Sequence, residues 1–164
     1  MYNLGILTSS DMGAAGLRED TSGQAIKDIF TPLGFSVARY EVVPDEGETI
    51  SAKLREWADS GEVDLLVTTG GTGLGPRDVT PEATHAVIQR PVPGISEAMR
   101  QGGLRHTPMA MLSRGTSGIR GSCLIINLPG SSRAVRESLE GVTEAITHAL
   151  ETLKRARVET HPPH

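Results

Sequence analysis

A short apolar run that leads straight into a glycine-rich turn constrains this chain more than any other feature. Residues 63–69 (VDLLVTT) are apolar or β-branched for the most part, and residues 70–78 (GGTGLGPRD) follow without a break. Thr80 is a good helix N-cap and Pro81 suits the first helical position, so the spacing predicts a helix from there to about Arg90. A buried strand, a tight turn and a helix in this order are typical of α/β domains.

The same alternation of strands and helices extends along the whole chain. Strands are predicted at residues 2–9, 35–43, 63–69, 109–112 and 123–127. Four further helices are predicted: one capped by Thr21 or Ser22, one that begins at about Glu48, one over 95–104, and one from Ser131 to about Arg157. The gap of about ten residues between the last two strands is short for a parallel crossover, which favours an antiparallel pair. The sequence therefore predicts an α/β sandwich with a mostly parallel, mixed central sheet.

Length and composition indicate one soluble domain. The 164 residues correspond to a single domain, which we place at 1–156, with a flexible tail at 157–164. No apolar run is long enough to span a membrane, and a net charge of −4 argues against nucleic-acid binding. The single cysteine, Cys123, excludes an intrachain disulfide framework and is expected to be a small buried apolar group. We expect a cytoplasmic protein that binds neither nucleic acid nor membrane.

Three loops follow predicted strands and precede predicted helices. They are Ser9–Asp20, Gly70–Val79 and Leu128–Ser131. Ligands of open α/β sheets bind at the carboxyl ends of the strands, so a pocket is expected where these loops converge.

The glycine loop, Gly70 to Gly73 and onward, is suited to holding an anion. Glycines let the backbone turn with positive φ and bring its N–H groups close to a ligand, beside a helix N-terminus. The spacing is GxGxG and no GK follows, so neither a dinucleotide fold nor a P-loop is indicated. A merely tight turn is the alternative. At the second such junction, Pro129 stiffens the turn, Gly130 permits close approach, and Ser131 either binds an anion or simply caps the helix.

Two carboxylates lie beside these turns. Asp45 lies between a strand and a helix, and Asp78 lies between the glycine loop and its helix. Carboxylates next to an anion site would repel phosphate unless a cation such as Mg²⁺ lay between them. The alternative is that each residue caps or precedes its helix.

Other polar residues carry weaker signals. Arg114, after Ser113 at the end of a predicted strand, is either a phosphate-binding fork or a surface arginine. No histidine has a Cys or His partner at metal-ligand spacing, which favours structural or surface roles for His85, His106 and His148. His161 and His164 belong to the expected tail.

The run at residues 68–84 (TTGGTGLGPRDVTPEAT) resembles the molybdopterin adenylyltransferase family, which contains bacterial molybdenum-cofactor enzymes and the G domains of gephyrin and its plant counterpart. Further matches, in the family's order, are residues 10–11 (SD), 19–23 (EDTSG), 43–46 (VPDE), 111–114 (MLSR), 118–121 (GIRG) and 125–131 (IINLPGS). The resemblance covers roughly residues 4–155. Leu74-Gly75 and Ser132-Arg133 differ from common members, at variable positions.

The resemblance implies a three-layer fold, usually a homotrimer, that uses Mg²⁺ and ATP to adenylate the terminal phosphate of molybdopterin, with release of pyrophosphate. It assigns catalysis and the metal to Asp45 and Asp78, and Asp11 less firmly to the nucleotide side. It assigns the pterin substrate to Gly70, Gly71, Thr72, Gly73, Ser113, Pro129, Gly130 and Ser131. It also allows for contacts with other proteins of the pathway.

Two other functions are compatible with the same residues. The first is a catalytically silent protein that binds molybdopterin as a carrier or scaffold, and the second is a domain of this fold that acts on another nucleotide. Retention of both Asp45 and Asp78 favours the enzyme.

Overall fold

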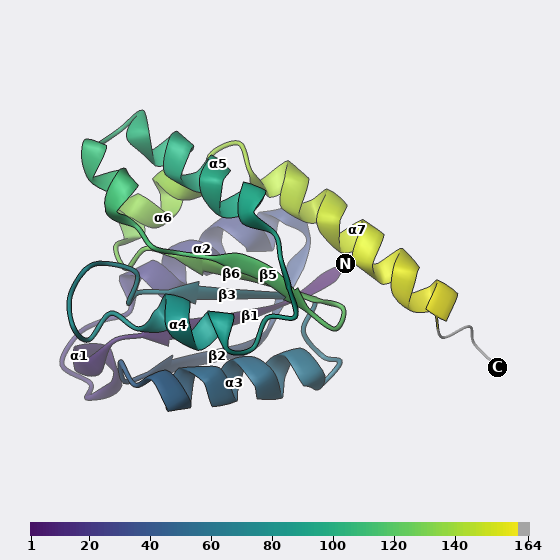
Figure 1. Ribbon diagram of the computed structural model, residues 1–164, viewed down its shortest axis with the longest axis horizontal. Helices are drawn as coiled ribbons and strands as arrows, with labels where there is room; N and C mark the ends of the chain where they lie inside the picture. The colour runs from purple at the N-terminus through teal and green to yellow at the C-terminus, as the bar shows by residue number, and fades with distance from the viewer. Residues whose placement is uncertain (161–164) are drawn as a thin grey trace.

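The computed structural model describes residues 1–160, which form a six-stranded sheet between two layers of helices (Figure 1). The strand order is β2-β1-β3-β6-β5-β4. The bounds are β1 Tyr2–Ser9, β2 Phe35–Val43, β3 Leu65–Thr69, β4 Arg90–Pro91, β5 Ser117–Arg120 and β6 Cys123–Leu128. The strands β2, β1, β3 and β6 are parallel to one another. At the other edge of the sheet, β5 runs antiparallel to β6, and β4 runs antiparallel to β5. The predicted mostly parallel, mixed sheet is confirmed.

Helices cover both faces of the sheet (Figure 1). On one face lie α2 (Thr21–Phe30), α5 (Pro93–Leu104), α6 (Ser132–Leu139) and α7 (Thr143–Thr160); on the other lie α3 (Gly47–Asp59) and α4 (Thr80–His85). Three short turns complete the fold: α1 (Asp11–Ala14), η1 (Thr31–Leu33) and η2 (Pro108–Leu112). The final turns of α7 extend past the sheet.

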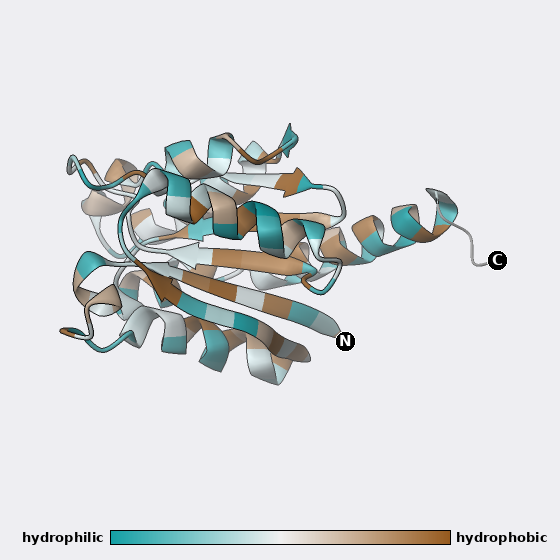
Figure 2. Cartoon of the chain, turned by 90° about the horizontal axis from the view of Figure 1, so that it is seen from below, coloured by the Kyte–Doolittle hydropathy of each residue, from teal (hydrophilic) through white to brown (hydrophobic). Residues whose placement is uncertain are grey.

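The two hydrophobic cores follow from the side-chain alternation of the central strands. Leu65 and Val67 of β3 point into the core under α2, α6 and α7, whereas Leu66 between them points into the core under α3 and α4. In β6, Ile125 likewise faces away from Leu124 and Ile126. Because both faces are covered, these strands are hydrophobic almost throughout, which Figure 2 shows as brown bands along the central arrows.

The strand predicted at 109–112 is wrong. These residues belong to η2, which begins at Pro108, and Met109 and Met111 are more than 60% exposed. The chain instead enters the sheet at β5, and β5 pairs antiparallel with β6. The antiparallel pairing is therefore present, but between other residues than the sequence predicted.

Several helix boundaries differ from the prediction, among them the start of α5, which lies at Pro93 rather than at residue 95. The helix α4 ends at His85 rather than near Arg90, because Arg90 pairs with Ile119 in the sheet. The single helix expected from Ser131 to Arg157 is two helices, α6 and α7, separated at Gly141, whose φ is +76°. The side chain that caps α2 is Asp20, which accepts from the Gly23 N–H at 3.0 Å.

The C-terminal residues partly contradict the expected tail. Residues 157–160 belong to α7, and residues 161–164, with His161 and His164, lie outside the described residues. Over residues 1–160, no helix combines the length and apolar character that a membrane crossing requires. Cys123 is 1% exposed, as expected, and this burial raises the pKa of its thiol to about 12.

Candidate functional site

The loops after β1, β3 and β6 converge at one end of the sheet, as the sequence predicted, and enclose two adjoining cavities. The larger cavity, of about 580 Å³, lies between the glycine loop, α5, η2 and α6. The smaller, of about 230 Å³, lies between the glycine loop, the β1–α2 loop and Asp45. Gly71, Asp78 and Gly130 line both cavities. A ligand in one cavity would therefore meet a ligand in the other at these three residues.

The glycine loop passes its neighbours too closely for side chains. Gly70 and Gly71 have φ of +94° and +67°, in the left-handed region. A Cβ on Gly70 would lie 2.3 Å from the carbonyl oxygen of Ser9, and one on Gly71 would lie 2.3 Å from Oγ1 of Thr80. The loop is thus packed against β1 and the start of α4, and its backbone faces the junction of the cavities.

Arg114 holds the glycine loop in place. Its Nε donates to the carbonyl of Gly73 at 2.8 Å, its Nη2 donates to the carbonyl of Asp78 at 2.7 Å, and its Nη1 pairs with Glu82. Its backbone N–H donates to the carbonyl of Thr72 at 2.9 Å. The sequence left open whether Arg114 binds phosphate or is an ordinary surface arginine. The structure shows neither, because the guanidinium is bound to protein groups of the glycine loop and α4.

Asp45 is oriented by two loop residues in the small cavity. Its Oδ1 accepts from the Ser9 hydroxyl at 2.5 Å, and its Oδ2 accepts from the Asp11 N–H at 3.0 Å. Asp11 completes the exchange by accepting from the Asp45 N–H at 2.9 Å. Asp11 itself lines neither cavity. The structure places it behind Asp45, where it fixes the position of that carboxylate.

Arg77 in turn holds Asp11 through two hydrogen bonds, of 3.1 Å from Nε and 2.9 Å from Nη2. The Arg77 hydrogen bond, followed by that of the Asp45 N–H, holds the pKa of Asp11 below its ordinary value. We expect Arg77→Met to raise the pKa of Asp11, measured by carboxyl-carbon NMR during a pH titration. Because the folded-state pKa is lowered, this pair stabilises the protein above the ordinary carboxyl pKa, and its contribution is lost as the pH falls through the lowered pKa.

Arg39→Met is the matched control for that titration, since Arg39 pairs with Glu62, away from the cavities. It should leave the Asp11 titration unchanged. An unchanged Asp11 pKa in Arg77→Met would show that the guanidinium does not bind the carboxylate in solution.

Asp78 lies at the junction of the two cavities. Its Oδ2 accepts from the Gly75 N–H at 2.9 Å, and over residues 1–160 no hydrogen bond reaches its Oδ1. Neither carboxylate caps a helix: the N-cap residues of α3 and α4 are Glu46 and Val79, and neither makes a side-chain cap bond. Each carboxylate instead directly precedes the N-cap residue, so of the alternative that it caps or precedes its helix only the second half holds. The expectation that Thr80 caps α4 is wrong. Thr80 is instead the first helical residue, and its hydroxyl is buried without a hydrogen-bond partner among residues 1–160.

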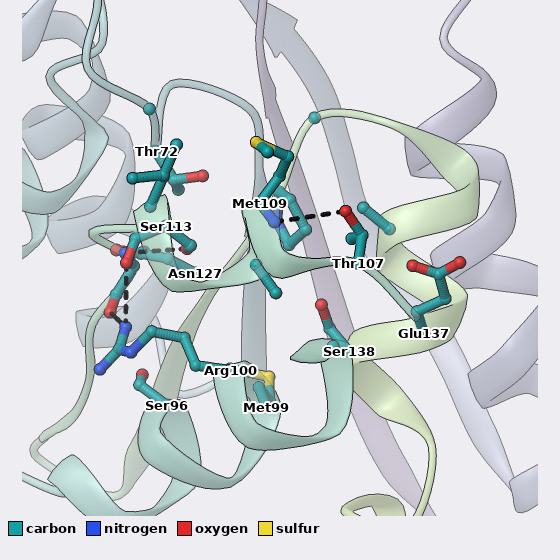
Figure 3. A pocket seen from close by; sticks show the side chains of 18 of the residues that line it. Thr72, Ser96, Met99, Arg100, Thr107, Met109, Ser113, Asn127, Glu137 and Ser138 are labelled. Carbon is teal, nitrogen blue, oxygen red and sulfur yellow. Dashed lines mark hydrogen bonds between the residues drawn. The ribbon is translucent and has the colours of Figure 1, made fainter. Parts of the chain in front are cut away.

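The large cavity contains two polar residues that sequence reasoning missed. Asn127 is 2% exposed, and its amide donates to the hydroxyls of Thr68 and Thr84 at 2.9 and 3.0 Å. Arg100 donates to the carbonyl of Gly115 at 2.8 Å and more weakly to that of Ser113, so it supports the segment that carries Ser113 (Figure 3). A polar residue inside the apolar run 123–128 was a usable signal for Asn127, because buried amides require partners. No comparable signal marked Arg100.

The remaining predicted residues divide between the two cavities. Thr72, Gly73, Ser113 and Pro129 line the large cavity, and Gly70 lines the small one. Ser131 lines neither: its hydroxyl accepts from the Ala134 N–H at 3.1 Å and caps α6. Of the two roles predicted for Ser131, anion binding and helix capping, the structure shows the capping.

Metal binding by protein side chains alone is not supported in the described part of the chain. Residues 1–160 contain no group of three or more His, Cys, Asp or Glu side chains that could hold an ion. His106 instead contacts Glu140 at 2.8 Å, and His148 is largely exposed. Asp45 and Asp78, which both line the small cavity, could hold Mg²⁺ together with oxygens of a bound phosphate, because Mg²⁺ commonly takes only one or two protein carboxylates.

Comparisons with known proteins show the family of this chain. A family model described as a probable molybdopterin binding domain matches residues 5–148. The molybdopterin adenylyltransferase of Helicobacter pylori is 44% identical over 156 residues, which cover 92% of this chain and 87% of that protein. The molybdopterin adenylyltransferase of Escherichia coli K12 is 36% identical over 97% of this chain and 89% of its own length.

Solved structures show the same fold. The molybdopterin biosynthesis enzyme MoaB of Thermus thermophilus is 54% identical and superposes with a TM-score of 0.87, covering 93% of this chain and 96% of that one. The tungsten cofactor synthesizing protein MoaB of Pyrococcus furiosus is 34% identical, with a TM-score of 0.83 and coverage of 93% and 96%. The architecture, the matched length and the sequence identity agree, and this chain belongs to the molybdopterin-binding family that includes the bacterial molybdopterin adenylyltransferases.

Proposed function

We propose that this protein is a molybdopterin adenylyltransferase of molybdenum cofactor biosynthesis, which uses ATP to adenylate the terminal phosphate of molybdopterin. The observation that carries the proposal is the pair of cavities that meet at Gly71, Asp78 and Gly130. Two substrates that react phosphate to phosphate need such a junction. Relatives named for this activity match over most of this chain.

The character of each cavity suggests its occupant. The large one is walled mainly by apolar and small side chains, among them Met99, Met109 and Leu112, and suits a flat heterocycle. The small one is polar and includes Ser9, Thr21 and Ser22, the last two in the first turn of α2. Hydroxyls and a helix N-terminus favour a polyphosphate. We assign molybdopterin to the large cavity and ATP to the small one.

The charges of the small cavity support a divalent cation. Glu19, Asp20, Asp45 and Asp78 line it, against Arg18 as the one basic residue among its described lining residues. A nucleoside triphosphate would be repelled there without counter-charge. We assign Mg²⁺ to Asp45 and Asp78, where it would neutralise phosphate charge and polarise the phosphoryl oxygens.

The protein's own contribution is positioning. In the proposed reaction an oxygen of the molybdopterin phosphate attacks the α-phosphorus of ATP, the new P–O bond forms, and the bond to the β-phosphate oxygen breaks to release pyrophosphate. Such a displacement requires alignment and charge stabilisation rather than a nucleophilic side chain. The packed glycine loop aligns the phosphates, and the Ser9 and Asp11 contacts hold Asp45 in place.

Release of pyrophosphate by the purified protein tests the proposal. We expect release only when ATP, Mg²⁺ and molybdopterin are all present, with ATP preferred over GTP or CTP. Binding of molybdopterin without pyrophosphate release would identify a carrier or scaffold instead. The homotrimer, the cytoplasmic location and contacts with other proteins of the pathway stay predictions.

A further inference from the structure

The large cavity has two chemically different sides (Figure 3). Thr72 and Ser113 lie on one side with the glycine loop, and Thr107, Glu137 and Ser138 lie on the other. Only three charged side chains are among the described residues that line it: Asp78, Arg100 and Glu137. Asp78 belongs to the junction with the small cavity, and Arg100 donates to the backbone carbonyls beside Ser113. Glu137 is thus the carboxylate on the side away from the junction.

Glu137 is a largely buried carboxylate that retains capacity to accept hydrogen bonds. Its side chain, on α6, is 12% exposed. Oε1 accepts from Nε of Arg133 at 2.8 Å, and Arg133 is itself 83% exposed. The imidazole of His106 is also nearby, with its Nδ1 4.0 Å from Oε1 of Glu137. Over residues 1–160 no hydrogen bond reaches Oε2. A carboxylate so placed is incompletely compensated, because each ionised oxygen can accept two hydrogen bonds.

We propose that Glu137 recognises the 2-amino-4-oxo pyrimidine edge of the pterin, a role that rests on the proposed function. The ring N3–H and the exocyclic amino group of a pterin form two parallel donors, much as a guanidinium does, and a carboxylate accepts such a pair in a bidentate arrangement. Oε2 and the remaining lone pair of Oε1 are the acceptors. With the phosphate at the glycine loop, this contact fixes the opposite end of the substrate. Met99 and Met109 line the cavity between the two sides and offer thioether contacts to the ring (Figure 3).

Two phosphate-free probes isolate this contact from the phosphate site: 6-hydroxymethylpterin, and 6-hydroxymethyllumazine, in which the 2-amino group is a carbonyl. Their affinities can be measured by titrating the fluorescence of each probe with protein. We expect the wild-type protein to bind the pterin about tenfold or more tightly than the lumazine, because the lumazine carbonyl would face the carboxylate. In Glu137→Gln the preference should fall to within about twofold.

Glu140→Gln is the matched control. It makes the same chemical change just beyond α6, but Glu140 pairs with His106 and does not line the cavity. It should keep the wild-type preference. If Glu137→Gln does not fold, Glu137→Asp serves instead: it keeps the charge, withdraws the carboxylate by one methylene and should lose most of the preference.

The outcomes separate this inference from the proposed function. A wild-type protein that binds neither probe, or binds both equally, would overturn the role of Glu137, as would a folded Glu137→Gln with the preference intact. Loss of the preference in Glu137→Gln together with no pyrophosphate release by the wild-type protein would retain pterin recognition and reject the adenylyltransferase.

Discussion

Asp45→Asn and Asp78→Asn should each lower the rate of pyrophosphate release by about 10²- to 10⁴-fold, the range expected when several kcal/mol of charge stabilisation are removed. The two side chains line the small cavity, and Asp78 also borders the large one. Asparagine keeps the size of each side chain, and its amide can still accept at one position, so the fold should persist. What is lost is the negative charge that would hold Mg²⁺ against the phosphates.

Pterin binding separates catalysis from folding in these variants. Asp45→Asn and Asp78→Asn should bind 6-hydroxymethylpterin with wild-type affinity, because the charge they lose acts on the phosphates rather than on the ring. Asp28→Asn provides the control: Asp28 accepts from Gln24 on α2 and lines neither cavity. Turnover within about threefold of wild type in both variants would remove the two carboxylates from the mechanism.

Gly71→Ala is expected to lower the free energy of unfolding by about 2–5 kcal/mol. Part of this cost is the left-handed backbone, at φ +67°, which an L side chain tolerates poorly. The rest is steric, since the new Cβ would lie 2.3 Å from Oγ1 of Thr80. Urea denaturation would measure the change.

Gly121→Ala isolates the backbone contribution. Gly121 has φ +58°, and a Cβ there meets nothing within 4 Å, so this variant should lose only about 1–2 kcal/mol. Adding Thr80→Ala to Gly71→Ala should recover much of the difference, because the clashing hydroxyl has no hydrogen-bond partner among residues 1–160 to lose. Equal losses in Gly71→Ala and Gly121→Ala would mean that the loop shifts freely and is not packed as described.

The sequence predicted the strands of the central sheet well because burial there leaves a local trace. Both β1 and β2 begin and end at the predicted residues. The strand prediction at 109–112 was wrong because four apolar residues are also compatible with an exposed 3₁₀ turn. No local pattern shows that β5 pairs with β6 in the sheet instead. The break between α6 and α7 was hidden for a related reason. Val142 beside Gly141 still packs into the core, so the apolar period continues across the break.

The candidate site was also predictable only in part. The convergence of three loops followed from topology, and the structure brings Gly71, Asp78 and Gly130 together. The partners that orient these residues could not be read from the sequence. Arg114 lies 36 residues from Asp78, and Asp11 lies 34 residues from Asp45. Such pairings depend on how distant segments pack, which local patterns do not encode.

The contacts of Arg114 also have an entropic consequence. A run of glycines is the most flexible backbone a chain can offer, and ordering it only when a ligand arrives would subtract from affinity. In this protein the loop loses that conformational entropy during folding, because the Arg114 guanidinium binds Gly73 and Asp78 of the loop and Glu82 of α4. The ligand therefore meets a loop whose conformational freedom has already been given up, so more of its binding free energy remains available for affinity and alignment.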